Sequence, residues 1–230
     1  MKTLNQYIKE KLIINQRFDE KLIINKDYVD AHTLTPESFD ELREIIEDRY
    51  DKLGEGTKDN PINFNDIDVS NLNSFYNKHK GKYGSGLFEH TKFKYIDISG
   101  WDVSNVKSMC RMFYWCKELK SVGDISNWDV SNANNMHCMF SHCNCLNPDV
   151  SSWDVSNVKD MSYMFRLCYS FNQDISGWDV SNVTNMDRMF EYCKSFNQDL
   201  SKWNLFRVSG MLMFDNCPIK YEYKPKFKWT

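Results

Sequence analysis

The sequence predicts an α/β repeat solenoid: a stack of units of about 25 residues, each with a short strand, a turn and a short helix, behind an N-terminal helical cap. Three observations predict this fold class. Tryptophans recur at an almost constant spacing, an apolar stripe follows each of the first four, and the polar residues between them repeat as well. The tryptophans lie 27, 25, 25 and 25 residues apart, at Trp101, Trp128, Trp153, Trp178 and Trp203.

The copies differ most at the two ends of the array. Those from Trp153 and Trp178 read WDVSNVKDMSYMFRLCYSFNQDISG and WDVSNVTNMDRMFEYCKSFNQDLSK. The copy from Trp203 is one residue short and lacks the DVSN residues, and a looser copy from Asp68 carries a Gly/Lys-rich insertion at 80–86. Atypical first and last units are expected, because the ends of a repeat array face solvent.

Each unit contains an apolar stripe at helical spacing. Met161, Met164, Phe165 and Cys168 stand at i, i+3, i+4 and i+7, which predicts one face of a short helix. Polar residues such as Asp160 precede the stripe and suit a helix cap. The equivalent stripes are Met109/Met112/Phe113/Cys116, Met136/Met139/Phe140/Cys143 and Met186/Met189/Phe190/Cys193.

A short strand is expected around Ile175, followed by a turn over the WDVSN segment. One unit buries too little apolar surface to offset the entropy of ordering about 25 residues. We therefore expect neighbouring units to stack and to pair their strands about 4.8 Å apart. The corresponding strand residues are Ile98, Ile125, Val150 and Leu200.

The chain divides into three predicted segments: an amphipathic leader and helical cap at 1–66, the repeat array at 67–217, and a C-terminal capping strand at 218–230. In the cap, SFDELREIIEDRYDKL predicts a helix with Thr35 as N-cap, Pro36 as first helical residue and Gly54 as the stop. The last segment alternates lysines with aromatic residues, and Pro225 restricts it to a sheet edge. The apolar stripe of the helix is Phe39, Leu42, Ile45, Ile46 and Tyr50.

The leader contains a tandem pair, EKLIINQRFD at 10–19 and EKLIINKDYV at 20–29. Two interpretations stay open: a helix or hairpin packed on the cap, or a docking peptide by which residues 1–30 bind an assembly partner.

The run WDVSNVTNMDRMFEYCKSFNQDLSKW resembles the BspA-like leucine-rich repeats, and the resemblance extends over roughly residues 68–217. It implies a leucine-rich-repeat-like solenoid with a role in adhesion or recognition. Members of that family are typically bacterial surface or secreted proteins, and they also occur in phages of gut bacteria. The resemblance implies no catalytic residues.

Charge and hydropathy narrow the functional classes. The formal net charge is −3, so we expect no nucleic-acid partner. No apolar run approaches the roughly 18 residues of a membrane span, and the N-terminal residues do not read as a signal peptide. We therefore expect a cytoplasmic or virion-associated protein rather than a secreted one.

The cysteines recur with the repeat, which favours buried thiols in the core rather than disulfides. One cluster breaks the pattern: Cys138, His142 and Cys145 would share a helical face at i, i+4 and i+7 and could bind Zn²⁺. Because the other repeats place no such residues there, we expect no metal and no cofactor. The core cysteines are Cys116, Cys143, Cys168, Cys193 and Cys217.

Two columns of aspartates could hold cations, or each carboxylate could accept N–H bonds within its own turn, which we favour. The tryptophan row could be an aromatic platform for a carbohydrate or peptide, but its strict phase favours core packing. The columns are Asp102/Asp129/Asp154/Asp179 and Asp97/Asp124/Asp149/Asp174/Asp199.

No motif for catalysis occurs. We expect a non-enzymatic scaffold whose repeat surface contacts a protein or glycan. The alternatives are a phage virion-associated structural or decoration protein anchored through its N-terminal segment and, as a minor one, an enzyme. The candidate binding residues vary between copies, and we expect them to face outward on the helical side: Arg111, His137, Ser162 and Asp187, or Tyr114, Ser141, Arg166 and Glu191.

Overall fold

A 15-residue α-helix, α3 (Phe39–Leu53), precedes the repeats. The computed structural model describes residues 33–228. The chain divides into two units, Met1–Thr33 and Leu34–Thr230, and the predicted leader at 1–30 lies outside the described residues.

The predicted N-cap residue of α3 is wrong by three positions. Ser38, not Thr35, is the N-cap, since its side chain accepts the N–H of Glu41. Gly54 ends the helix as predicted.

The strands of the described region are very short. β1 (Ile62–Asn63) pairs in parallel with β4 (Ile96–Asp97), and β5 (Asn204–Phe206) pairs in parallel with β6 (Lys226–Lys228). β2 (Tyr76–Asn77) and β3 (Ser85–Gly86) form an antiparallel pair within the insertion of the first repeat. A 3₁₀ turn, η1 (Tyr221–Tyr223), precedes β6.

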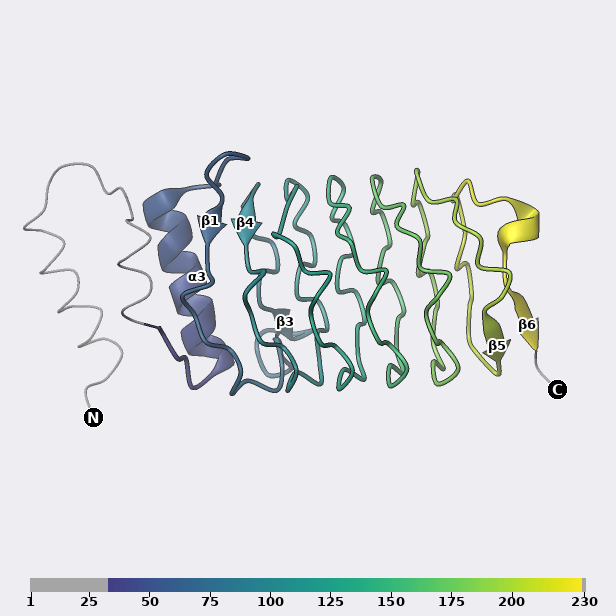
Figure 1. The fold of residues 1–230 in the computed structure, drawn as a ribbon, viewed down its shortest axis with the longest axis horizontal. Helices are drawn as coiled ribbons and strands as arrows, with labels where there is room; N and C mark the ends of the chain where they lie inside the picture. Colours follow the sequence, from purple (N-terminus) through teal and green to yellow (C-terminus); the bar gives the residue numbers. More distant parts are fainter. Residues whose placement is uncertain (1–32, 229–230) are drawn as a thin grey trace, which may run out of the picture. The chain divides into compact units, whose positions relative to one another are not determined.

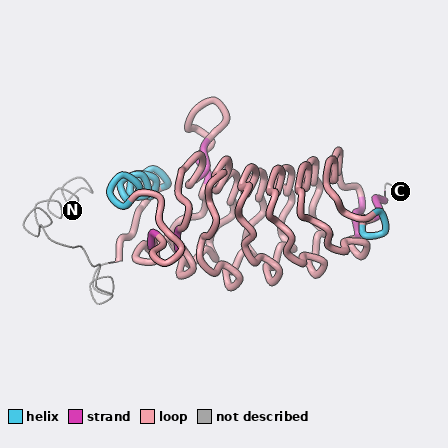
Figure 2. Tube along the Cα trace, turned by 90° about the horizontal axis from the view of Figure 1, so that it is seen from above, coloured by secondary structure: helices cyan, strands magenta, loops and turns pink. Residues whose placement is uncertain are grey.

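The predicted fold class, an α/β repeat solenoid, is wrong. Within residues 33–228, α3 is the only α-helix, and the strands form three separate two-stranded sheets. The units contain no helix at the Met/Phe/Cys stripe and no strand at Ile125, Val150 or Ile175. Almost the whole repeat region is loop and turn (Figure 2). The leucine-rich-repeat-like pattern of strand and helix therefore does not describe these units.

Isolated parallel bridges join successive repeats instead. They link six residues, one in each of six successive units, each just before the stripe or its equivalent. These units lie side by side between α3 and β6 (Figure 1). Each of the four inner residues of this column pairs with one on either side, so that the repeats share one register although no continuous strand forms. The column is Ser74, Ser108, Asn135, Asp160, Asn185 and Ser209.

The prediction of an apolar interior made from the stripes is confirmed. Met161, Met164 and Phe165 are fully buried, and Cys168 is 1% exposed. The stripe phenylalanines form a column of stacked rings: the centroids of Phe113 and Phe140 lie 5.4 Å apart with 6° between the planes. Their equivalents in the other three stripes have the same burial to within 1%.

The tryptophans belong to this core, so that the alternative of an exposed aromatic platform is wrong. The five repeat tryptophans are 3–5% exposed. The indole of Trp153 donates its N–H to the carbonyl of Ile125, and that of Trp178 donates to Val150, at 2.9 and 3.0 Å. Four of the five repeat indoles therefore also connect one repeat to the one before it; that of Trp128 has no hydrogen-bond partner among the described residues.

The C-terminal segment covers part of the last repeat. β6 runs beside β5, and Leu200 donates its backbone N–H to Tyr223 at 2.9 Å. The prediction of a strand near Pro225 is confirmed for residues 226–228.

Candidate interaction surface

The stripe Met-x-x-Met-Phe-x-x-Cys folds as two consecutive four-residue turns rather than as a helix. In the unit from Trp101, Met112 donates its N–H to the carbonyl of Met109, and Cys116 donates to Phe113. These are i to i+3 bonds, and two turns in succession give the same apolar spacing as a helix. The third residue of each turn has a positive φ, 57° at Arg111 and 63° at Trp115, as in a type II turn.

These turns present one set of side chains, which we call the turn face. It comprises the two central residues of each turn. Four consecutive units contribute 110, 111, 114 and 115; 137, 138, 141 and 142; 162, 163, 166 and 167; and 187, 188, 191 and 192.

Backbone bonds hold the turn face in register. Arg111 donates its N–H to the carbonyl of His137, and Trp115 donates to Ser141, both at 2.9 Å. The equivalent bond of the next unit runs from Cys138 to Ser162 at 3.0 Å. The left-handed residues are thus among those whose N–H groups reach the next unit, as are stripe residues such as Met109 and Phe113.

All eight predicted candidates lie on the turn face, but the expectation that they face outward is wrong for three. Ser141, Ser162 and Glu191 are only 1%, 2% and 3% exposed. Arg111 does not stand at the repeat position of His137, Ser162 and Asp187; the residue at that position in its unit is Cys110. The partly exposed candidates are Arg111, Tyr114, His137, Arg166 and Asp187.

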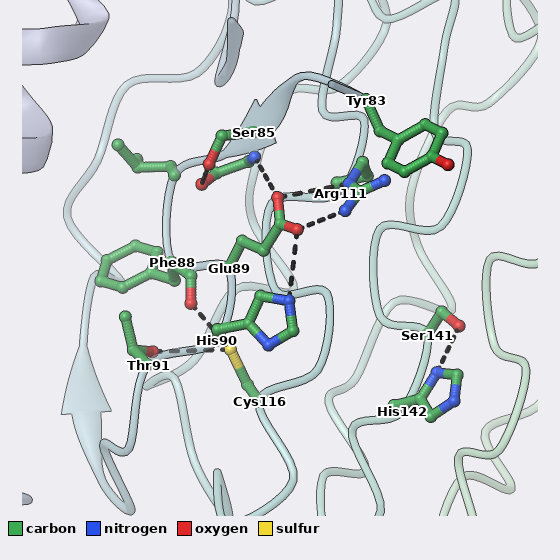
Figure 3. A network of polar contacts seen from close by, with 12 residues as sticks. Tyr83, Ser85, Phe88, Glu89, His90, Thr91, Arg111, Cys116, Ser141 and His142 are labelled. Atoms are coloured by element: carbon green, nitrogen blue, oxygen red, sulfur yellow. Dashed lines mark hydrogen bonds and ion pairs between the residues drawn. The ribbon is translucent and has the colours of Figure 1, made fainter. Parts of the chain in front are cut away.

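Glu89 and Arg111 form an ion pair at the start of the turn face (Figure 3). The side chain of Glu89 is 7% exposed, and its carboxylate also accepts the backbone N–H of Gly86 at 2.7 Å. His90 Nε2 lies 3.5 Å from the same carboxylate. The guanidinium of Arg111 in turn lies 4.2 Å from the ring centre of Tyr114. A buried charge is thereby compensated, and Arg111 is fixed against the face.

A second buried carboxylate organises the opposite half of the face. Glu191 accepts bonds from Arg166, one repeat earlier, and from Arg188 in the preceding turn of its own unit. Its side chain is 4% exposed, so the two arginines neutralise it. Since Asp187 also stands on this half of the turn face, the two arginines there are balanced in formal charge by two carboxylates.

An aromatic and imidazole cluster joins the two halves. The rings of Trp115 and His142 stack with centroids 4.5 Å apart, and Lys117 lies 4.0 Å from the centre of the Trp115 ring. His142 Nδ1 lies 3.0 Å from Ser141 Oγ, as Figure 3 shows. Burial and the charge of Arg166 lower the pKa of His142 to about 4, so that its imidazole is neutral at pH 7.

A further polar contact spans two units. His137 Nδ1 lies 2.7 Å from Ser162 Oγ, and its Nε2 lies 3.3 Å from Cys138 Sγ. Burial lowers the pKa of His137 and raises that of Cys138 to about 12. Both groups are therefore neutral near pH 7.

The structure does not assemble the zinc candidates. Cys138 is buried beside His137, His142 contacts Ser141 and Arg166, and Cys145 is exposed. Within the described part of the chain, no group of three or more His, Cys, Asp or Glu is arranged to hold a metal ion.

The aspartate columns serve the backbone. Asp179 Oδ1 accepts the N–H of Ser181, and Asp174 Oδ1 accepts that of Ser176, both at 3.0 Å. These bonds lower the pKa of both carboxyls. Aspartates of both columns in the neighbouring repeats make the same bond with the serine two residues on.

The cysteine column also has a backbone partner. Cys168 Sγ donates to the carbonyl of Phe140 at 2.9 Å, and Cys193 Sγ donates to Phe165 at 2.8 Å. All eight cysteines are free thiols. The buried thiols are therefore part of the repeat interface, as the sequence predicted for four of the five; Cys217 is only partly buried.

Sequence reasoning missed several residues of the turn face and of the first repeat beside it. Glu89 and His90 belong to the irregular first repeat, where the insertion hides the phase. Trp115, Tyr163 and Arg188 were overlooked although they stand at repeat positions. A strict alignment of the units from their tryptophans would have identified these three.

A family model described as "Mycoplasma protein of unknown function, DUF285" matches the chain over residues 60–124, 84–176 and 115–222. These overlapping matches cover more than half of the chain, and the protein belongs to this family. It is a repeat protein. No curated protein and no solved structure matched the chain. In residues 33–228, no helix has the length and hydropathy of a membrane span.

Proposed function

We propose that this protein is a non-enzymatic binding module whose turn face recognises another protein. One observation carries the proposal: the residues that differ most between units stand at the turn centres, on a backbone that repeats. The same turn position is occupied by Cys110, His137, Ser162 and Asp187 in four successive units. A regular scaffold with irregular side chains on one face suits selective contact with an irregular partner surface.

The chemistry of the face favours a protein over a glycan. Tyrosine, arginine and tryptophan contribute disproportionately to protein–protein affinity, because they combine a large contact area with directed polar groups. Stacking of a sugar on Trp115 is disfavoured, since Lys117 and His142 both lie close to its ring. The resemblance to BspA-like repeats, which implied recognition or adhesion, supports the same class of function.

The surface is also organised before any partner binds. The Glu89–Arg111 and Arg166–Glu191–Arg188 ion pairs fix the long arginine side chains. Fixing them in advance reduces the conformational entropy lost on association. This favours a rigid contact of the kind seen in pre-organised complexes.

The test is a selection of binders from a random peptide library, run beside a glycan array. The variant replaces Tyr114, Tyr163 and Tyr192 by alanine, and the matched control replaces the exposed Tyr83, Tyr169 and Tyr221. We expect peptides whose affinity falls at least about tenfold with the turn-face variant and not with the control. Binding that both variants retain, or binders only on the glycan array, would contradict the proposal.

A further inference from the structure

The two ends of the repeat ladder differ chemically. At the N-terminal end, backbone carbonyls of the first repeat have no preceding unit to bind. Arg43 of α3 supplies the donors: Nη1 donates to Gly86 and Leu87 at 2.7 and 2.8 Å, and Nη2 donates to Glu89 at 3.2 Å. The guanidinium thus closes this end with N–H groups on one planar fork.

The C-terminal end of the ladder presents donors instead of acceptors. In the unit before it, Arg188, Phe190 and Tyr192 donate their N–H groups to the carbonyls of the last repeat. The matching donors of the last repeat are the N–H groups of Leu212, Phe214 and Asn216, and none of them has an acceptor among residues 33–228. We call these three N–H groups and the adjoining Met211 the donor edge.

Among the described residues, 218–228 cover only part of this end of the molecule. A Cβ built on Gly210 would lie 2.3 Å from ring atoms of Phe227, so that ring lies against Gly210. Lys224 lies 5.8 Å from the ring centre of Phe214. Beyond them, Met211 and Leu212 are 63% and 45% exposed. Unpaired backbone donors beside apolar side chains are typical of edges that accept a further strand.

We infer that the donor edge binds a peptide segment of a partner protein, which adds one more rung to the ladder. The occupant must supply backbone carbonyls at every second residue, because the ladder inside the chain is built this way. Carbonyls of Asp187, Met189 and Glu191 accept N–H groups from Tyr163, Phe165 and Leu167 at 2.8–3.0 Å. Apolar side chains of the segment would cover Met211 and Leu212.

A second copy of the chain does not fit through its ladder ends. Two donor edges facing each other would oppose N–H groups to N–H groups. At the other end, Arg43 already occupies the carbonyls that could accept them. The donor edge is separate from the residues that carry the proposed function, so either proposal can fail without the other.

The test uses a fluorescent peptide with the sequence of residues 184–194 and the change Cys193→Ser, which contains the carbonyls of one rung. We expect saturable binding, and protection of the amides of Leu212, Phe214 and Asn216 from hydrogen exchange. The double variant Met211→Lys/Leu212→Lys should weaken binding at least about tenfold. The control variant Tyr221→Lys, at an 89% exposed site, should bind as the unchanged protein does, and a scrambled peptide should not bind.

Three outcomes would overturn the inference: no saturable binding up to about 1 mM peptide, equal affinity of the double-lysine variant, or protection confined to other amides. The exchange measurement uses the unchanged protein, so it decides the question even if the double variant does not fold.

Discussion

The stripe cysteine combines apolar bulk with a directed hydrogen bond. Its side chain fills the core, and its thiol donates to a phenylalanine carbonyl of the previous repeat, as Cys143 does to Phe113 at 3.0 Å. Burial raises the pKa of Cys116 to about 12, which keeps this thiol protonated and able to donate at neutral pH. A column of thiols is therefore compatible with a structural role.

The lowered pKa of His142 predicts that the stability of the protein depends on pH. Its pKa falls to about 4 in the folded protein, against about 6.5 when unfolded. The native state thus favours the neutral imidazole, and its contribution is complete above about pH 6.5 and is lost as the pH falls towards 4. The variant His142→Gln should lose less thermal stability between pH 7 and pH 4.5 than the unchanged protein does.

The matched control is His79→Gln, at an exposed histidine of the first repeat. Thermal unfolding of all three proteins at both pH values checks the prediction. If His142→Gln and His79→Gln lose the same stability as the unchanged protein, His142 does not titrate as described.

At the scale of the element, paired turns replace the expected helix. Four apolar residues at i, i+3, i+4 and i+7 fit one helical face and equally fit the corners of two successive four-residue turns. What separates the two is the positive φ of residues such as Tyr163 and Leu167, at 60° and 59°. None of these positions is a glycine, so that no residue type there indicates a left-handed backbone.

Burial could be predicted from the sequence for apolar residues that recur at a regular spacing. The burial of Met161 and Phe165 followed from spacing alone, and so did most of the apolar face of α3. The polar partners of the turn face were not predictable, because Glu191 meets Arg166 across 25 residues only when the repeat register is known. Its burial likewise depends on that pairing rather than on its residue type.

The bonds of Arg43 to the first repeat lead us to expect that this residue stabilises the N-terminal end of the repeat array. Replacing it by methionine removes the guanidinium bonds to the carbonyls of Gly86, Leu87 and Glu89. We expect Arg43→Met to lower the free energy of unfolding by about 1–3 kcal/mol. Its neighbour Glu47 bonds Arg43 Nε at 2.8 Å and is 58% exposed, so the control Glu47→Gln should change stability by less than about 1 kcal/mol.

Chemical denaturation of the two variants measures this difference. Equal stability of Arg43→Met and Glu47→Gln would show that the guanidinium is not needed to close the ladder.

At the scale of the whole described unit, regularity and variation are divided between different atoms. Backbone bonds, stacked rings and thiols repeat from one unit to the next, and they hold the register. The turn centres carry the variation, and with it the proposed recognition of a partner. The described molecule is thus a regular support whose side surface and C-terminal edge are both open to contacts.

Residue-resolved hydrogen exchange tests the central claim most directly, namely that turn pairs are joined by N–H groups donated to the next repeat. We predict slow exchange for Cys138, His142, Tyr163 and Leu167, whose N–H groups donate to the following unit. Leu212 and Asn216, at the matching positions of the last repeat, should exchange rapidly. Fast exchange at the four internal positions, or equal protection of the two terminal ones in the free protein, would contradict the account.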